Sequence, residues 1–164
     1  MKILMASDHA GFELKKEIFS YLIELGYQVE DKGPFQYIPD DDYPDFILPV
    51  AEAVSKDENL RAIILGGSGQ GEAITANRFE NVRAVVYYAH NLDVIRLARE
   101  HNNSNALSLG ARFLTVEEAK TAVRLWLETD FSGDSRHLRR LQKINLLGTP
   151  SAKDSGDNSK ISKN

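Results

Sequence analysis

Residues 61–78, RAIILGGSGQGEAITANR, carry the side chains and turns of this chain that are best suited to chemistry. The apolar run 62–65 is typical of a strand buried on both faces. Four glycines follow within six residues, at positions 66, 67, 69 and 71. Glu72 comes next, and a helix from here could have an inner face made of Ala73, Ile74 and Ala76. A strand, a glycine turn and a helix start bring free backbone N–H groups to one point. The stretch therefore predicts a site for a phosphate or for an oxyanion formed during a reaction.

Three named motifs come close to this glycine stretch, and each fails. The P-loop pattern requires Lys where the chain has Glu72, whose carboxylate would repel a phosphate. The dinucleotide fingerprint would need a third glycine at the same position, and the hydrolase motif G-x-S-x-G has Gln70 in place of its last glycine. A tight turn without chemistry is the alternative. A carboxylate directly beside an anion site instead suits a base placed next to the charge it creates.

Further polar side chains follow the first predicted strand. Asp8 and His9 come directly after the apolar run 3–6, as Ser68 and Glu72 come after the run 62–65. The carboxyl ends of parallel strands meet at one edge of a sheet, so these four residues are expected to share a rim. The alternative is that Asp8 is only a helix N-cap and that His9 is solvated.

Two groups of basic residues lie in the second half of the chain. His101, with Asn102, ends a helix that begins near Asn91, and a cationic His is favourable at a helix C-terminus. That helix runs back toward the amino end of the next strand, so a catalytic His101 would have to reach a neighbouring subunit. Arg136 and Arg140 share a helix face and could clamp a phosphate. A solvated helix face or a nucleic-acid contact are the alternatives.

The elements that must position these residues alternate along the chain. Strands are expected at 3–6, 27–30, 62–65, 83–88 and 106–109. Helices are expected between them: up to Gly26, from about Pro49 to Ser55, from Glu72, from Asn91, and from the capping box Thr115–Glu118. This alternation predicts an α/β fold with a parallel sheet of about five strands covered on both sides. A last helix is expected at 135–147, pointing away from the sheet. We expect a single domain, 1–147, followed by a disordered polar tail, 148–164.

The composition fits this reading. A chain of 164 residues with 42% hydrophobic and 27% charged residues is that of one ordinary globular domain. A net charge of −4 gives no reason to expect nucleic acid or an anionic membrane as partner. With no Cys there is no disulfide, thiol nucleophile or thiolate metal site. No signal peptide or membrane span is recognisable, so a cytoplasmic location is expected.

Six segments together resemble the ribose-5-phosphate isomerase B family, in the wider group that includes galactose-6-phosphate isomerase subunits. They are SDHAG at 7–11, DYP at 42–44, GGSGQGEAITANR at 66–78, REHNN at 99–103, GAR at 110–112 and RHLRR at 136–140. The resemblance covers roughly residues 2 to 147, in order and in register. It implies a Rossmann-like three-layer α/β/α sandwich whose C-terminal helix extends to a partner subunit. It also implies a homodimer, which could pair into a tetramer, with composite active sites and neither a metal ion nor an organic cofactor.

The implied reaction interconverts ribose 5-phosphate and ribulose 5-phosphate through ring opening and an enediolate. By this resemblance His101 would help to open the ring, with Asp8 nearby. Many family members use a Cys base where this chain has Gly66, and the chain resembles instead the subgroup in which a residue placed like Glu72 is the base. The enediolate would be held by the loop N–H groups of Gly67, Gly69 and Gly71, with Ser68 beside the base. The phosphate would be bound by His9, Arg136 and Arg140, and the pocket lined by Tyr43, Asn102 and Arg112.

Three other functions stay open at the level of sequence. The substrate could be a six-carbon sugar phosphate such as allose 6-phosphate or galactose 6-phosphate. The chain could also be a sugar-phosphate binding module without turnover, or a hydrolase built on Ser68, His101 and Asp8. The sequence also leaves the pKa of Glu72 open, because a helix N-terminus and loop amides would lower it while burial would raise it.

Overall fold

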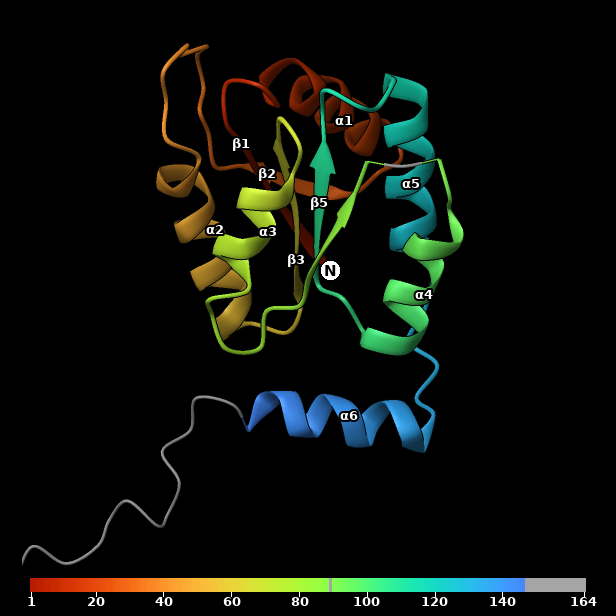
Figure 1. Cartoon of the computed structure of the whole chain (residues 1–164). Helices are drawn as coiled ribbons and strands as arrows, with labels where there is room; N and C mark the ends of the chain where they lie inside the picture. The colour runs from red at the N-terminus through yellow and green to blue at the C-terminus, as the bar shows by residue number, and fades with distance from the viewer. Residues whose placement is uncertain (89, 147–164) are drawn as a thin grey trace, which may run out of the picture.

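The computed structural model describes residues 1–88 and 90–146, and it contains a five-stranded parallel sheet (Figure 1). The strands are β1 (Lys2–Ser7), β2 (Gln28–Asp31), β3 (Leu60–Gly66), β4 (Ala84–Tyr87) and β5 (Ala106–Gly110). They are arranged in the order β2-β1-β3-β5-β4, and every neighbouring pair is parallel. The predicted parallel sheet of about five strands is confirmed. The predicted domain end at residue 147 and the predicted tail, 148–164, lie outside the described residues.

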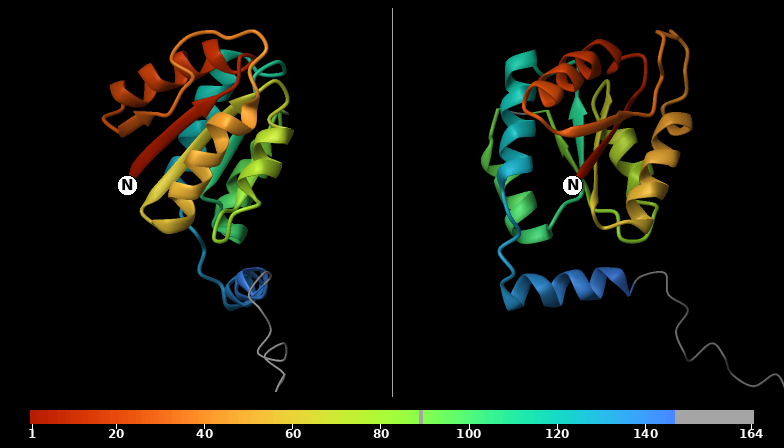
Figure 2. Two further views of the ribbon diagram at one scale, coloured as in Figure 1. Left: turned by 90° about the vertical axis from the view of Figure 1, so that its left-hand side faces the viewer. Right: turned by 180° about the vertical axis from the view of Figure 1, so that it is seen from behind.

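Six helices complete the described fold, and five of them cover the sheet. They are α1 (Phe12–Glu24), α2 (Tyr43–Lys56), α3 (Gln70–Ala76), α4 (Asp93–Asn102), α5 (Val116–Glu128) and α6 (Ser135–Asn145). α2 and α3 pack on one face of the sheet, and α1, α4 and α5 pack on the other (Figures 1 and 2). None of the helices described is long and apolar enough to cross a membrane.

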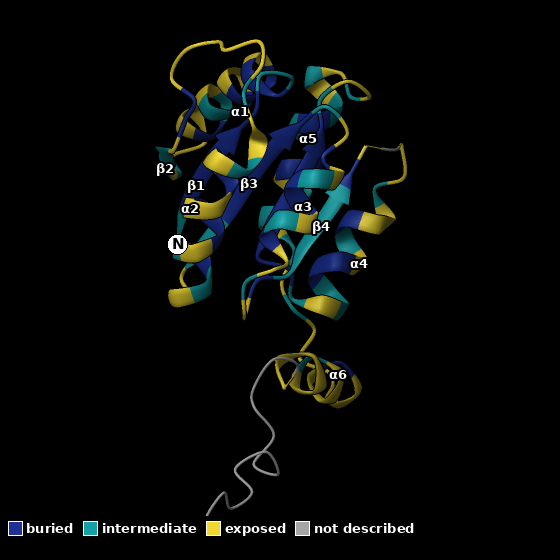
Figure 3. Ribbon diagram, turned by 60° about the vertical axis from the view of Figure 1, so that its left-hand side comes forward, coloured by how far each residue is buried: buried dark blue, intermediate teal, exposed yellow. Residues whose placement is uncertain are grey.

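The two cores follow from the period of two along the strands. In β3, Ile63 and Leu65 point into the core under α1, α4 and α5, whereas Ala62 and Ile64 point into the core under α2 and α3. Each of these four side chains is at most 2% exposed. The central strand therefore has no polar face, which explains why it reads as a continuous apolar run and appears dark blue along the middle of Figure 3.

Two details of the predicted helices are wrong. α2 begins at Tyr43 and not near Pro49, because Pro44 stands in the first turn, where its missing N–H costs no hydrogen bond. Pro49 is tolerated inside the same helix on its exposed side. Ile74 was expected on the inner face of its helix but is 66% exposed, while Ala73, Ala76 and Glu72 are buried.

The helix α6 lies apart from the sheet, across the amino ends of its strands (Figures 1 and 2). Its one buried side chain is His137, whose ring stacks on that of His101 in α4 with centroids 4.2 Å apart. Leu138 and Ile144 on the same helix are 44% and 51% exposed. The predicted last helix is present, therefore, and it is held to the rest of the chain by few contacts.

Candidate active site

The glycine loop between β3 and α3 is fixed against the end of β5. Gly69 has φ +75°, in the left-handed region that favours glycine. A Cβ at this position would also lie 3.0 Å from the Leu109 carbonyl carbon. Ser108 Oγ donates a hydrogen bond to the Gly69 carbonyl at 2.6 Å. The loop conformation is thus set by β5, and the first N–H groups of α3, which a helix cannot satisfy internally, start at this rim.

Glu72 lies in the first turn of α3 and is 3% exposed. Its carboxylate occupies the space beside Gly66: a Cβ built on Gly66 would lie 1.9 Å from Oε1 and 2.1 Å from the carboxyl carbon. Burial raises the pKa of Glu72 above its ordinary value, its own backbone N–H acts in the opposite direction, and the charge of Asp8 adds to the increase. The sequence leaves open whether burial or the backbone amides dominate. Burial is the larger effect, so the pKa of Glu72 is raised and its carboxylate is a stronger base.

Asp8 follows β1 and is 7% exposed. Its Oδ1 accepts a hydrogen bond from the N–H of Gly11 at 2.9 Å. Because α1 begins at Phe12 with Gly11 as its N-cap, Asp8 stabilises the turn before the helix and is not the N-cap itself. In this position the carboxylate of Asp8 is close enough to Glu72 for its charge to raise the pKa of Glu72. The carboxylates of Asp8 and Glu72 therefore share the rim, as the sequence predicts.

His9 is held by an acidic residue that sequence reasoning did not single out. Asp41 Oδ1 accepts a hydrogen bond from the backbone N–H of His9 at 3.0 Å and lies 2.7 Å from its Nδ1. The Asp41 side chain is only 4% exposed, and its Oδ2 has no hydrogen-bond partner among the described residues. The sequence alone gave no signal for this contact, because it depends on the pairing of β2 with β1, which brings the loop that follows β2 past the same rim.

Tyr43, Ser68 and Arg112 complete the rim. The Tyr43 ring packs on Gly71, where a Cβ would lie 2.7 Å from its Cζ, and the guanidinium of Arg112 lies beside Gly67. Ser68 is exposed at the tip of the loop, and its Oγ accepts a hydrogen bond from the N–H of Gln70 at 3.3 Å. One chain thus brings nine of the predicted site residues to the carboxyl edge of the sheet. We call them the rim cluster: Asp8, His9, Tyr43, Gly67, Ser68, Gly69, Gly71, Glu72 and Arg112.

The other predicted site residues lie at the opposite edge. His101 and Asn102 end α4 near the amino ends of the strands, and Arg136 and Arg140 are exposed on α6 (Figure 1). We call these four the basic cluster. The expectation that His101 lies at the far end of its own sheet is confirmed. Burial lowers the pKa of the neighbouring His137, and the charges of His101 and Arg136 add to this effect.

The described residues contain no group of three or more His, Cys, Asp or Glu side chains that could hold a metal ion. The rim cluster instead combines a buried carboxylate of raised pKa, a glycine turn at a helix start, and an arginine. This combination can remove a proton from a bound molecule and stabilise the resulting oxyanion.

Comparison with known proteins places these features in a family. The sequence model of the family described as Ribose/Galactose Isomerase matches residues 3–144. The chain is 42% identical over 141 residues to ribose-5-phosphate isomerase B of Mycolicibacterium paratuberculosis, covering 86% of this chain and 87% of that protein. It is 39% identical over 150 residues to ribose-5-phosphate isomerase B of Escherichia coli, covering 89% and 95%. Ribose-5-phosphate isomerase B from Mycoplasma genitalium, solved with bound ribulose-5-phosphate, superposes with a TM-score of 0.83 and 38% identity, covering 88% and 93%.

The raised pKa of Glu72 makes a prediction about stability. The native state binds the Glu72 proton more tightly than the unfolded state does, so the fold loses stability as the pH rises from the ordinary value of 4.5 through the raised value. Glu72→Gln, which cannot ionise, should become more stable relative to wild type over that window. Urea unfolding at about pH 4 and about pH 8 measures this difference. Glu117→Gln, at a side chain that is 84% exposed, is the matched control. If the difference in the free energy of unfolding between Glu72→Gln and wild type were the same at both pH values, the prediction would be wrong.

Proposed function

Since the chain belongs to the ribose/galactose isomerase family, we propose that it is a ribose-5-phosphate isomerase. It interconverts ribose 5-phosphate and ribulose 5-phosphate, an aldose and its ketose. The observation that carries this conclusion is the ribulose-5-phosphate bound to the Mycoplasma genitalium relative, with which the chain shares its fold and 38% sequence identity over 88% of its length. In this proposal the rim cluster would supply the base and the oxyanion donors that such a reaction requires.

We assign the role of base to Glu72. Its carboxylate would take the proton from C2 of the open-chain aldose, leaving an enediolate with its charge on O1. Return of the proton to C1, with transfer of the O2 hydroxyl proton to O1, gives the ketose. The raised pKa would strengthen the base, and the glycine-loop N–H groups would hold the enediolate oxygens, which the start of α3 directly after this loop supports. Glu72 fills the space beside Gly66, where many relatives are expected to carry a Cys, so base and substrate could keep the same relative position.

We further propose that the active site is composite, with the basic cluster of one subunit completing the rim cluster of its partner. The two clusters lie at opposite edges of one sheet, so a single chain does not bring them together. The outer faces of the helices offer apolar surface for a partner, including Ile74 on α3, Val94 and Leu97 on α4, and Ile144 on α6. In such a homodimer His101 would help to open the sugar ring, with Asp8 nearby, and Asn102 would line the pocket. Arg136, Arg140 and His9 would bind the phosphate.

The assignment of the base predicts the activity of Glu72→Gln. Wild type should convert ribose 5-phosphate to ribulose 5-phosphate with EDTA present, and Glu72→Gln should lower kcat by about 100- to 10,000-fold, because the amide cannot accept the C2 proton. Ketose formation is the measurement, and Glu117→Gln should retain wild-type turnover. Normal turnover by Glu72→Gln would assign the proton transfer to another group.

The close contact at Gly66 predicts that even one methyl group harms the site. Gly66→Ala would place a Cβ where the Glu72 carboxylate lies, so this carboxylate must move away from the substrate. A displacement of about 1 Å is expected to lower kcat on the order of 100-fold. Turnover and the thermal unfolding midpoint should be measured together. Wild-type kcat in a folded Gly66→Ala protein would show that the position of the carboxylate is not critical.

The composite site can be tested by mixing two inactive variants. Glu72→Gln lacks the base of the rim cluster and His101→Ala lacks a member of the basic cluster, so each homodimer has two defective sites. A mixed dimer has one site with both defects and one intact site. Random mixing by joint refolding should therefore restore about a quarter of wild-type activity. If the mixture is no more active than its parents while sedimentation shows dimers, the two clusters do not meet across subunits.

A further inference from the structure

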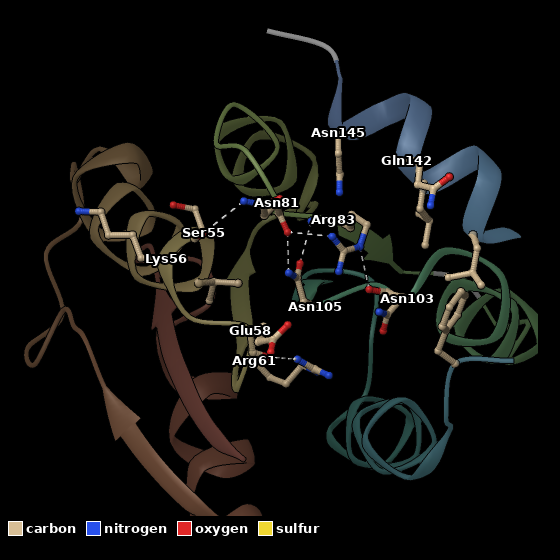
Figure 4. A pocket seen from close by; sticks show the side chains of 14 residues that line it. Ser55, Lys56, Glu58, Arg61, Asn81, Arg83, Asn103, Asn105, Gln142 and Asn145 are labelled. Carbon is tan, nitrogen blue, oxygen red and sulfur yellow. Dashed lines mark hydrogen bonds between the residues drawn. The ribbon is translucent and has the colours of Figure 1, made fainter. Parts of the chain in front are cut away.

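A cavity of about 660 Å³ lies at the edge of the sheet opposite the rim cluster, between the strand starts and α6 (Figure 4). It contains none of the residues assigned above to the active site. Its floor is formed where three neighbouring strands begin. Ala62, Ala106 and Ala84 are partners in the sheet register, so the residues that precede them, Arg61, Asn105 and Arg83, lie in one row. Two arginines thus flank an asparagine on a rigid sheet edge.

Neither arginine has an ion-pair partner among residues 1–88 and 90–146. Arg61 Nη1 donates to the backbone carbonyls of Glu58 and Leu60, each at 3.0 Å. Arg83 donates from Nε to the Asn103 carbonyl at 2.9 Å and from Nη1 to the Asn81 carbonyl at 3.0 Å. In the structure described, Nη2 of both arginines makes no hydrogen bond. The charge of each guanidinium is therefore held in place but not compensated.

Some arginines of the chain have a carboxylate partner, whereas the buried Arg99, like Arg61 and Arg83, donates only to uncharged oxygens among the described residues. Arg96 and Arg124, on exposed helix faces, each lie 2.8 Å from a glutamate carboxylate four residues away. Burial lowers the pKa of both Arg61 and Arg83, and the charge of Arg61 lowers that of Arg83 further. Half-buried like charges without a counter-ion are unfavourable, and a bound anion would relieve this.

The other charges at the cavity do not supply that counter-ion. Among the described lining residues the one carboxylate is that of Glu58, which is exposed and outside ion-pair distance of either arginine. Lys56, on the rim of the cavity, is paired with Glu52 at 2.6 Å. The field inside the cavity is therefore positive, within a chain whose net charge is −4.

Neutral polar groups around the arginines are also fixed. Asn105 Nδ2 donates to the Asn81 carbonyl, and its Oδ1 accepts from the backbone N–H of Arg83, both at 2.7 Å. On the far side, Gln142 and Asn145 extend from α6 toward the cavity (Figure 4). Planar guanidinium groups with free N–H donors, together with amides, match the oxygens of a phosphate.

We propose that this cavity is a second anion site, which binds the phosphate group of a small organic phosphate at Arg61 and Arg83. The organic part would lie toward α6, where Phe131, Leu138 and Leu141 provide an apolar wall and the two amides provide polar contacts. This site does not depend on the isomerase assignment. It would exist whether or not the rim cluster is catalytic.

Isothermal titration calorimetry of the full chain tests the proposal, with inorganic phosphate and adenosine 5′-monophosphate as probes. Arg61→Gln should weaken binding at one site per subunit on the order of 10-fold or more, because it removes charge-assisted hydrogen bonds. Arg61 bonds only to nearby backbone carbonyls, so the fold and the turnover of ribose 5-phosphate should be retained. Arg61→Lys keeps the charge without the planar guanidinium, so its affinity for the probes should lie between those of wild type and Arg61→Gln. Arg124→Gln changes the net charge equally and is the matched control.

Two results would overturn the proposal. In one, Arg61→Gln, folded by circular dichroism, binds both probes as wild type does. In the other, Arg124→Gln weakens binding as much as Arg61→Gln, which would assign the effect to net charge alone. If Arg61→Gln does not fold, Arg61→Lys decides the matter, since unchanged binding of both probes by that variant would exclude recognition by the guanidinium fork.

Discussion

The site depends on one close contact, the burial of the Glu72 carboxylate beside a residue without a side chain. Gly66 ends the central strand, and the carboxylate lies where its Cβ would otherwise be. A carboxyl group removed from water in this way favours its protonated form. The glycine therefore does more than allow a turn, because it provides the space in which Glu72 becomes a stronger base. The turn at Gly69, fixed by Ser108, then brings the start of α3 to the same place.

A parallel sheet places a second constraint on the site. All strand ends that can share chemistry lie at one edge, and each helix returns the chain to the other edge. A residue at the end of a helix, such as His101, is thereby kept from the rim of its own sheet. If both ends are needed for one reaction, two chains must meet. The exposed apolar residues on α3, α4 and α6 are consistent with this requirement, and so is the outward position of Ile74.

Much of the fold could be predicted because it rests on local patterns. The apolar runs gave the five strands, and the capping box at Thr115 and Glu118 is present as predicted, with both reciprocal hydrogen bonds. The start of α2 was predicted too late because either Pro44 or Pro49 could stand in the first turn of a helix. In the structure Pro44 stands there and Pro49 lies inside the helix. Ile74 was misplaced because a seven-residue helix is too short for its periodicity to define an inner face.

Four members of the rim cluster, Asp8, His9, Ser68 and Glu72, were predictable for a similar reason, since the residues that follow buried strands meet at one edge, whereas Tyr43 and Arg112 were expected only from the family resemblance. Asp41 was not predictable in this way. It comes from a long loop, and its contact with His9 depends on the path that the loop takes across the rim. The row of Arg61, Asn105 and Arg83 lies at the amino ends of three strands that are distant in the sequence, so it could be recognised only from the strand order and register.

The helix α6 connects these observations. An isolated helix of 11 residues is marginal in water, and this one buries a single side chain against the rest of its chain. Its stability must therefore come largely from further contacts. A partner subunit would cover its exposed apolar residues, and an anion bound at the sheet edge would link its amides to the strands. Both contacts would also orient Arg136 and Arg140, which belong to the same rigid helix. Under both proposals, occupation of the cavity at one edge of the sheet would influence the orientation of Arg136 and Arg140, the two arginines proposed to bind the phosphate at a partner's rim cluster.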